Sequence, residues 1–407
     1  MRSVQATDGE VVCYWNYGQF LDANAGPVIA AWDYVESTGD KGWLKERIEQ
    51  LEFISDFLAR RDTDGLVDAV QSGNLNTLKM PGRSCCWFDC LSGGKDGYSN
   101  AIIYRAWRCL ADLEDKLGRA EQRRRYTELA DKLKAAYVKT LYNRSTGWLA
   151  WWKSADGRLH DYASPAVNGL AIEYGLIEPA LGGQILARLR AKMEQAGFQR
   201  FDLGVPCTLV PVLRGDYLTP GALGGPTRED GTDTFGQYMN GGITAAQTLQ
   251  FIAAHYVVGE DDKADAMLQA MLGHLAKTGF QSRVGGGIDW NTWNGRACGY
   301  EGYLADCFRF LQAVPPQPEP KKITFNVPDP PQPIDCCECG PDRPCKDGKV
   351  WTRQHADLRI AEGDLIGDCN NGRELLNLCA TRGIDTLLYM GVASNKPLVA
   401  LRTSVVP

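Results

Sequence analysis

Paired helical segments joined by a glycine are the feature that most constrains the fold of this 407-residue chain. Glycine suits the left-handed residue that ends a helix, and a short turn there folds two helices back on each other as a hairpin. Apolar residues recur at helical spacing on either side of these turns, as in Leu44, Ile48 and Leu51. The sequence therefore predicts four helical hairpins, followed by a last helix over residues 299–314. The four turn glycines are Gly39, Gly118, Gly175 and Gly259.

The segments between the hairpins are longer and are rich in Gly, Trp, Tyr, Asn and Asp. They cover residues 61–97, 142–165, 197–240 and 280–299. Loops of this length in a compact domain are usually functional or disordered, and these are too aromatic for disorder. Each one leads into a helix, with inner helices expected to start near residues 16, 98, 163, 240 and 299. We therefore expect a functional site at the end of the molecule where the long loops lie.

Charge and hydropathy exclude several classes of protein. The net charge is -6 and no basic patch stands out, so nucleic acid is not an expected partner. No run of 18 apolar residues is present, so no membrane association is expected. The N-terminal residues lack the apolar core of a signal peptide, and the 14 cysteines are scattered rather than arranged as a secreted disulfide framework. These features favour a cytoplasmic protein.

The composition changes after residue 314, which predicts three parts. Residues 1–314 form the helical domain, residues 315–335 a Pro-rich linker, and residues 336–407 a small partial α/β segment. The last part contains a short amphipathic helix and an apolar strand, "TLLYMGVAS".

Carboxylates and aromatic residues occur together in each long loop. Aromatic rings pack on the apolar faces of sugars, and hydrolysis of a glycosidic bond needs two carboxyl groups, one to protonate the leaving oxygen and one to activate water. An Asp between aromatic side chains, such as Asp89 after Trp87 and Phe88, has the raised pKa that suits the acid. A single aromatic residue more often fills the end of a helical bundle, and a single Asp more often caps a turn. The recurrence of the same composition in several loops favours a sugar site.

The hairpins and loops of residues 10–314 resemble the six-hairpin glycosidases, which are (α/α)6 toroids that include amylo-α-1,6-glucosidase and trehalase-like enzymes. The stretch "WFDCLSGGKDGYSNAIIYRAW" (87–107) is similar to the family segment in which a Trp-x-Asp loop supplies the general acid, and this resemblance implies that Asp89 is the acid. The stretch "GGIDWNTWNGRACGYEGYLADCF" is similar to the segment that carries the base, which implies Asp289 or Glu301. About five of the six hairpins of a complete toroid are expected.

Together these observations predict a glycoside hydrolase that acts on α-linked glucosyl- or mannosyl-type saccharides by an inverting two-carboxylate mechanism, with no cofactor and no metal. A non-catalytic carbohydrate-binding protein, or a degenerate fusion of truncated hydrolase domains, is the alternative. The residues expected to bind the substrate are Trp15, Trp87, Trp151, Trp152, Tyr238, Asn240, Trp290, Trp293 and Tyr300.

The C-terminal segment resembles the later half of isochorismatase-like cysteine hydrolases. Its Gly391-Val392-x-x-Asn395 turn matches the family's nucleophile turn, but Pro397 stands where that family has its cysteine, so no cysteine-hydrolase activity is expected. Four cysteines lie close together in this segment, with His355 ten residues after the last of them. Only one pair has the Cys-x-x-Cys spacing of a zinc site and no second well-spaced pair follows, so reduced thiols are favoured there over a zinc site. These cysteines are Cys336, Cys337, Cys339 and Cys345.

Overall fold

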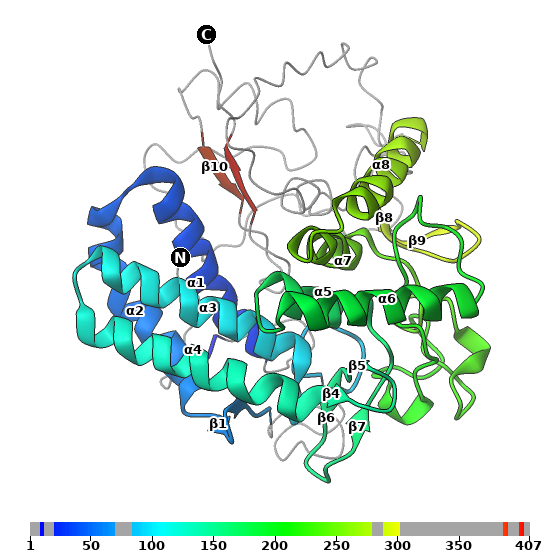
Figure 1. Cartoon of the computed structure of the whole chain (residues 1–407), viewed down its shortest axis with the longest axis horizontal. Coiled ribbons are helices and arrows are strands. Elements are labelled where there is room, and N and C mark those ends of the chain that lie inside the picture. The colour runs from blue at the N-terminus through cyan, green and yellow to red at the C-terminus, as the bar shows by residue number, and fades with distance from the viewer. Residues whose placement is uncertain are drawn as a thin grey trace, which may run out of the picture. The chain divides into compact units, whose positions relative to one another are not determined.

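The computed structural model describes residues 9–11, 20–69, 84–278, 288–301, 386–389 and 399–402. Within these ranges, eight α-helices follow one another as four hairpins (Figure 1). The hairpins are α1 (Leu21–Thr38) with α2 (Lys41–Ala59), α3 (Gly97–Lys116) with α4 (Ala120–Leu141), α5 (Pro165–Glu173) with α6 (Pro179–Gln195), and α7 (Ala245–Val257) with α8 (Asp261–Thr278).

The four glycines predicted to join the paired helices all adopt the left-handed conformation. Their φ angles are +69° at Gly39, +71° at Gly118, +78° at Gly175 and +77° at Gly259. Other residues rarely adopt this region of φ, so glycine ends the first helix of each pair at little cost. The local turn chemistry therefore fixes the hairpin order that the sequence predicts.

The odd-numbered helices form an inner row, and the even-numbered helices lie outside it. α1 packs against α3, α3 against α5 and α5 against α7, and each inner helix also packs against its own outer partner. The outer helix α4 buries one stripe, which includes Tyr126, Leu133 and Tyr137, whereas α3 is buried on most of its faces. This alternation confirms the mainly α architecture of a helical toroid.

Short strands lie in the long segments that connect an outer helix to the next inner helix. One hairpin pairs β1 with β2, another pairs β4 with β5, and a third pairs β8 with β9, while β3, β6 and β7 form a three-stranded sheet in the order β3-β6-β7. The predicted helix over 299–314 is wrong at its start, because residues 299–301 belong to β9, and residues 302–314 lie outside the described residues. The bounds are β1 Asp62–Thr63, β2 Leu66–Val67, β3 Lys95–Asp96, β4 Tyr142–Asn143, β5 Trp148–Leu149, β6 Trp152–Lys153, β7 Leu159–His160, β8 Ile288–Asn291 and β9 Ala297–Glu301.

A polar side chain at the fourth position of each inner helix ties a long loop to the helix. In α3, the amide of Asn100 accepts a hydrogen bond from the Val67 N–H (2.8 Å) and donates one to the Val67 carbonyl (2.9 Å). In α5, Asn168 makes the same pair of bonds with Leu149. Because buried backbone groups need partners, these side chains set where each loop leaves the helical domain. The corresponding residues of α1 and α7 are Asn24 and Thr248.

By its internal contacts the chain divides into two units, one of residues 1–316 with 390–399 and the other of residues 317–389 with 400–407. In the C-terminal region the described residues form β10 (Thr386–Tyr389), which pairs with β11 (Val399–Arg402). β10 lies in the predicted apolar strand "TLLYMGVAS", and the other elements predicted there lie outside the described residues. None of the described helices has both the length and the apolar character needed to cross a membrane.

Candidate active site

Asp89 lies in the loop before α3, and the backbone of a second long loop holds it in place. The Asp89 carbonyl accepts a hydrogen bond from the Leu218 N–H (3.0 Å), and the Leu91 N–H donates to the Asp216 carbonyl (2.9 Å). Cys90 and Tyr217 lie opposite each other between these two bonds. The long loop between α6 and α7 therefore fixes the backbone on both sides of the Asp89 side chain.

Aromatic rings pack behind the Asp89 loop. The Phe88 ring centroid lies 4.4 Å from that of Trp87, 4.6 Å from that of Tyr98 and 5.0 Å from that of Trp151. The indole N–H of Trp87 donates to the Tyr98 hydroxyl (3.0 Å). Asp89 itself is 8% exposed, and this burial raises the pKa of its carboxyl. A carboxylic acid in such surroundings keeps its proton to a higher pH than a solvated one, as a general acid requires.

The side chain of Tyr238 also contacts Asp89. A hydrogen bond from Tyr238 to the Asp89 carboxylate works against the effect of burial and lowers the pKa of Asp89, whereas the nearby charge of Asp289 raises it. Tyr238 has a φ of +38°, which is uncommon for a residue with a side chain. Backbone strain of this kind occurs most often at binding and catalytic sites.

Asp289 lies on β8, and its charge acts on both Asp89 and Tyr238. Gly299 of β9 stands beneath it: a Cβ on Gly299 would lie 2.5 Å from the Asp289 Cβ and 2.5 Å from its Oδ2. The close approach of the two strands at this point therefore depends on glycine. Asp89, Tyr238 and Asp289 come from three different long loops, and the fold brings their polar groups within electrostatic reach of one another.

Two predicted tryptophans lie on the same β8–β9 hairpin. The Trp290 ring centroid is 5.9 Å from that of Tyr238. Trp293 donates its indole N–H to the Gly241 carbonyl (2.5 Å) and packs edge-on against Phe198 and Phe235. Trp290 therefore borders the site beside Tyr238, while Trp293 fastens the hairpin to the loop that carries Tyr238.

Three other predicted substrate-binding residues are buried. The Asn240 side chain accepts from the Val212 N–H (2.7 Å) and donates to the Gly231 carbonyl (2.8 Å), which holds the Tyr238 loop together. Trp151 and Trp152 are at most 1% exposed and form part of the core behind the site. This geometry favours a supporting role for all three. Trp15 and the side chains of Tyr300 and Glu301 lie outside the described part of the chain.

A buried network that the sequence did not suggest supports the loop opposite Asp89. His160 Nδ1 lies 2.7 Å from Asp216 Oδ2, and the Tyr162 hydroxyl donates to the same carboxylate. Burial raises the pKa of the Asp216 carboxyl, but hydrogen bonds from His160 and Tyr162, together with the charges of His160 and Arg158, lower it overall. Ser154 Oγ lies 3.0 Å from His160 Nε2, but it donates to Asp156.

The contacts from Ser154 to His160 to Asp216 are those of a hydrolytic triad, yet all three residues are at most 5% exposed. The network therefore positions the backbone that holds Asp89 and does not itself meet a substrate. No periodic or composition signal in the sequence marks it.

Comparison with protein families matches residues 23–208 to the bacterial alpha-L-rhamnosidase six-hairpin glycosidase domain. Comparison with curated protein sequences finds no match.

Similar solved structures include a rhamnosidase from Klebsiella oxytoca with rhamnose bound (14% identity, TM-score 0.47), and this match covers 72% of the present chain and 46% of the rhamnosidase. The match to a GH63 mannosylglycerate hydrolase from Thermus thermophilus in complex with glucose (15% identity, TM-score 0.49) covers 76% of the present chain and 84% of the hydrolase. The match to an alpha-L-rhamnosidase from Streptomyces avermitilis complexed with L-rhamnose (14% identity, TM-score 0.44) covers 76% of the present chain and 25% of that enzyme. The chain thus spans about half of the length of the Klebsiella rhamnosidase.

The family match begins in α1 and runs through α6 to residue 208, and it includes the loop of Asp89. The helices that it covers are three of the four hairpins described above, in the same alternating order of inner and outer helices. Residues 23–208 thus match the six-hairpin glycosidase domain, and the structure places three helical hairpins in that stretch.

Proposed function

We propose that this protein is a glycoside hydrolase that cleaves an α-linked sugar with inversion, with Asp89 as the general acid and Asp289 as the general base. The observation that carries the proposal is the convergence of Asp89, Tyr238 and Asp289 from three separate loops. In an inverting enzyme the acid protonates the leaving oxygen while the base removes a proton from the attacking water.

The surroundings of the two carboxyl groups support these roles. Burial favours the protonated form of Asp89, and the negative charge of Asp289 favours it further. Asp289 is half-buried, so part of the residue remains in contact with solvent. Trp290 and Tyr238 supply aromatic faces beside the two carboxyl groups, where the apolar face of a sugar ring can pack.

For the sugar, the first candidate is an α-L-rhamnosyl group, since the matched family model is that of an alpha-L-rhamnosidase domain. The sequence resemblance favours α-linked glucosyl or mannosyl groups, and these are the second candidates. All three classes present a pyranose ring to the same pair of carboxyl groups. Choosing among them therefore requires a substrate panel.

The experiment is a screen of purified full-length protein with 4-nitrophenyl α-L-rhamnoside, α-D-glucoside and α-D-mannoside, followed by proton NMR of the first-formed anomer. Release of the inverted anomer supports the proposal, and release of the retained anomer contradicts the water-activating role of Asp289. Asp89→Asn is expected to lower turnover of an alkyl glycoside by about 10²–10⁴-fold, while Asp230→Asn, which changes an exposed carboxylate in the Tyr238 loop, leaves it unchanged. Sugar binding without turnover in the unmodified protein would favour a carbohydrate-binding protein instead.

A further inference from the structure

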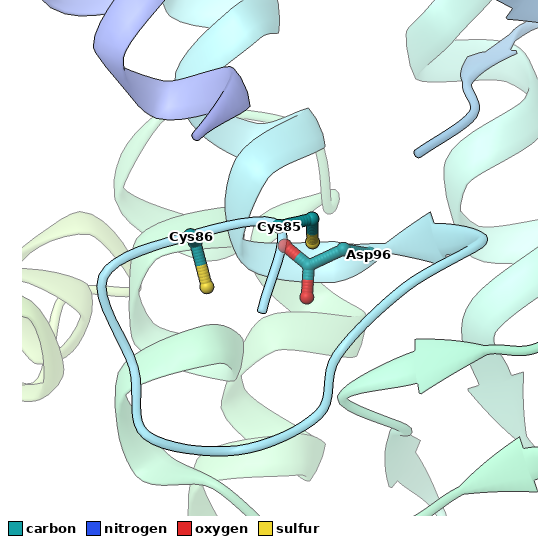
Figure 2. Close-up of side chains that lie close together, drawn as sticks. All are labelled: Cys85, Cys86 and Asp96. Carbon is teal, nitrogen blue, oxygen red and sulfur yellow. The ribbon is translucent and has the colours of Figure 1, made fainter. Parts of the chain in front are cut away.

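Two cysteines and an aspartate meet in a buried cluster next to the loop of Asp89. The sulfur atoms of Cys85 and Cys86 and a carboxylate oxygen of Asp96 all lie within 4.8 Å of one another. All three residues are 0% exposed. Figure 2 shows Cys85 and Cys86 on the loop and Asp96 at the end of β3, where the chain enters α3.

A serine hydroxyl is a fourth polar group beside the two thiols and the carboxylate. Ser92 Oγ lies 3.3 Å from Cys85 Sγ and 3.5 Å from Cys86 Sγ. In tetrahedral zinc sites with sulfur ligands at ~2.3 Å and oxygen ligands at ~2.0 Å, a sulfur and an oxygen ligand are separated by ~3.5 Å. The serine oxygen therefore already lies at the distance from both thiols that a shared tetrahedral ion requires. The Asp96 oxygen lies within 4.8 Å of both sulfur atoms, so binding an ion requires only a short movement of its carboxylate toward them.

The buried carboxyl groups at and near the cluster lack a cationic partner. Asp96 Oδ1 accepts the Ser99 N–H (2.6 Å) as the N-cap of α3, and the side chains of Ser99, Ser92 and Cys85 also hydrogen-bond to this carboxylate. Asp22 of α1 is 8% exposed, its Oδ1 is buried without a hydrogen-bond partner among the described residues, and its charge interacts with Asp96 and Cys86. Among the described residues, no lysine or arginine pairs with either carboxyl. Buried carboxylates are usually paired or coordinate a metal, so these oxygens point to a missing cation.

We propose that Cys85, Cys86 and Asp96 bind a zinc ion, with the Ser92 oxygen as the fourth ligand. Thiolate ligands select zinc over magnesium or calcium, which prefer sites made of oxygen alone. Two thiolates and one carboxylate around Zn²⁺ leave one net negative charge, and the ion supplies the positive charge that the cluster otherwise lacks.

Such an ion would be structural, since four protein ligands leave no position open for a water or a substrate. It would join the loop segment that carries Cys85 and Cys86 to the N-cap of α3, and Asp89 lies three residues after Cys86 in that segment. The ion would therefore limit the movement of the general acid without touching the substrate. This inference does not depend on the identity of the sugar or on the proposed activity.

The test is a measurement of zinc by mass spectrometry on full-length protein purified without chelators. We expect about one zinc per chain in the unmodified protein and less than about a tenth of that in Cys85→Ser/Cys86→Ser and in Asp96→Asn. Asparagine also caps helices, so Asp96→Asn keeps α3 intact while it removes the charged ligand. The triple variant Cys336→Ser/Cys337→Ser/Cys339→Ser removes the other cysteine cluster, and it should keep its zinc.

A second readout protects against variants that fail to fold. Cobalt added to chelator-treated unmodified protein should give the intense near-ultraviolet thiolate absorption of a cobalt–cysteine site, and zinc should abolish it. The proposal is overturned if the unmodified protein carries no zinc and gives no cobalt–thiolate band. It is equally overturned if zinc persists in Cys85→Ser/Cys86→Ser but is lost from the triple variant.

Discussion

Replacing Gly299 with alanine is expected to disable the site while leaving the helical domain folded. The new Cβ would stand 2.5 Å from both the Cβ and the Oδ2 of Asp289. Non-bonded carbon atoms pack at about 3.5–4.0 Å, so Asp289 or the β9 backbone has to move by about 1 Å or more. A displacement of that size in a reacting group lowers the rate by about 100-fold, which corresponds to about 2.7 kcal/mol of activation free energy.

Part of the effect of this substitution is unrelated to Asp289. Gly299 has a φ of +82°, where a residue with a side chain loses about 1 kcal/mol of folding stability. Gly118→Ala is the matched control: its φ is +71°, it lies at the tight-turn end of α3, and no atom lies within 4 Å of its added Cβ. Both variants should therefore share the loss of stability that comes from φ, while only Gly299→Ala should also disturb Asp289 and lose activity.

The assay is kcat/KM on the best substrate of the panel, with the free energy of unfolding measured by urea denaturation of the same preparations. The reasoning is refuted if Gly299→Ala retains activity within about threefold of Gly118→Ala, since a 1 Å displacement of the base costs far more than that. It is also refuted if both variants lose activity to the same extent.

Two further changes probe the acid and the loop attachments. Tyr238→Phe removes the hydrogen bond that lowers the pKa of Asp89, so the pKa of Asp89 should rise. Because the acid works in its protonated form, the high-pH limb of the kcat/KM profile should then move to higher pH. A limb that stays in place or moves to lower pH would exclude this coupling between Tyr238 and Asp89. Asn100→Ala leaves the buried N–H and carbonyl of Val67 without partners, and it should lower the free energy of unfolding by about 2–5 kcal/mol in urea denaturation. The exposed Asn294→Ala should change that free energy by less than about 0.5 kcal/mol, and a similar small change in Asn100→Ala would show that the attachment adds little.

The helical hairpins could be predicted from the sequence because their signals are local. A glycine ends each first helix through its own φ, and apolar residues at helical spacing mark the buried stripe without reference to the rest of the chain. The start of β9 shows where this reasoning fails. The apolar spacing after Gly299 is typical of a helix, but pairing with β8 holds residues 297–301 as a strand. Pairing with β8, which the apolar spacing of residues 299–314 does not reveal, decides between these two structures.

The site depends even more on distant residues. Asp89 could be proposed from its aromatic neighbours and a family resemblance, but nothing near Tyr238 in the sequence indicates that its hydroxyl meets Asp89. Asn240 shows the opposite error, because an asparagine in a long loop suggests sugar binding while its amide is used by the backbone of its own loop. Cys85 and Cys86 have no ligand spacing such as Cys-x-x-Cys in the sequence, and only the fold places Asp96 beside them.

The most direct test of the two-carboxylate account is the dependence of Asp89→Asn on the leaving group. Asparagine preserves the shape of the side chain but cannot give a proton, and a general acid contributes about 10²–10⁴-fold to a rate. With an alkyl glycoside, whose leaving oxygen needs that proton, the variant should lose kcat/KM by this factor. With a 2,4-dinitrophenyl glycoside of the same sugar, whose leaving group departs unprotonated, it should lose less than about tenfold. Equal losses on the two substrates, or no loss on the alkyl glycoside, would contradict the assignment of Asp89 as the proton donor.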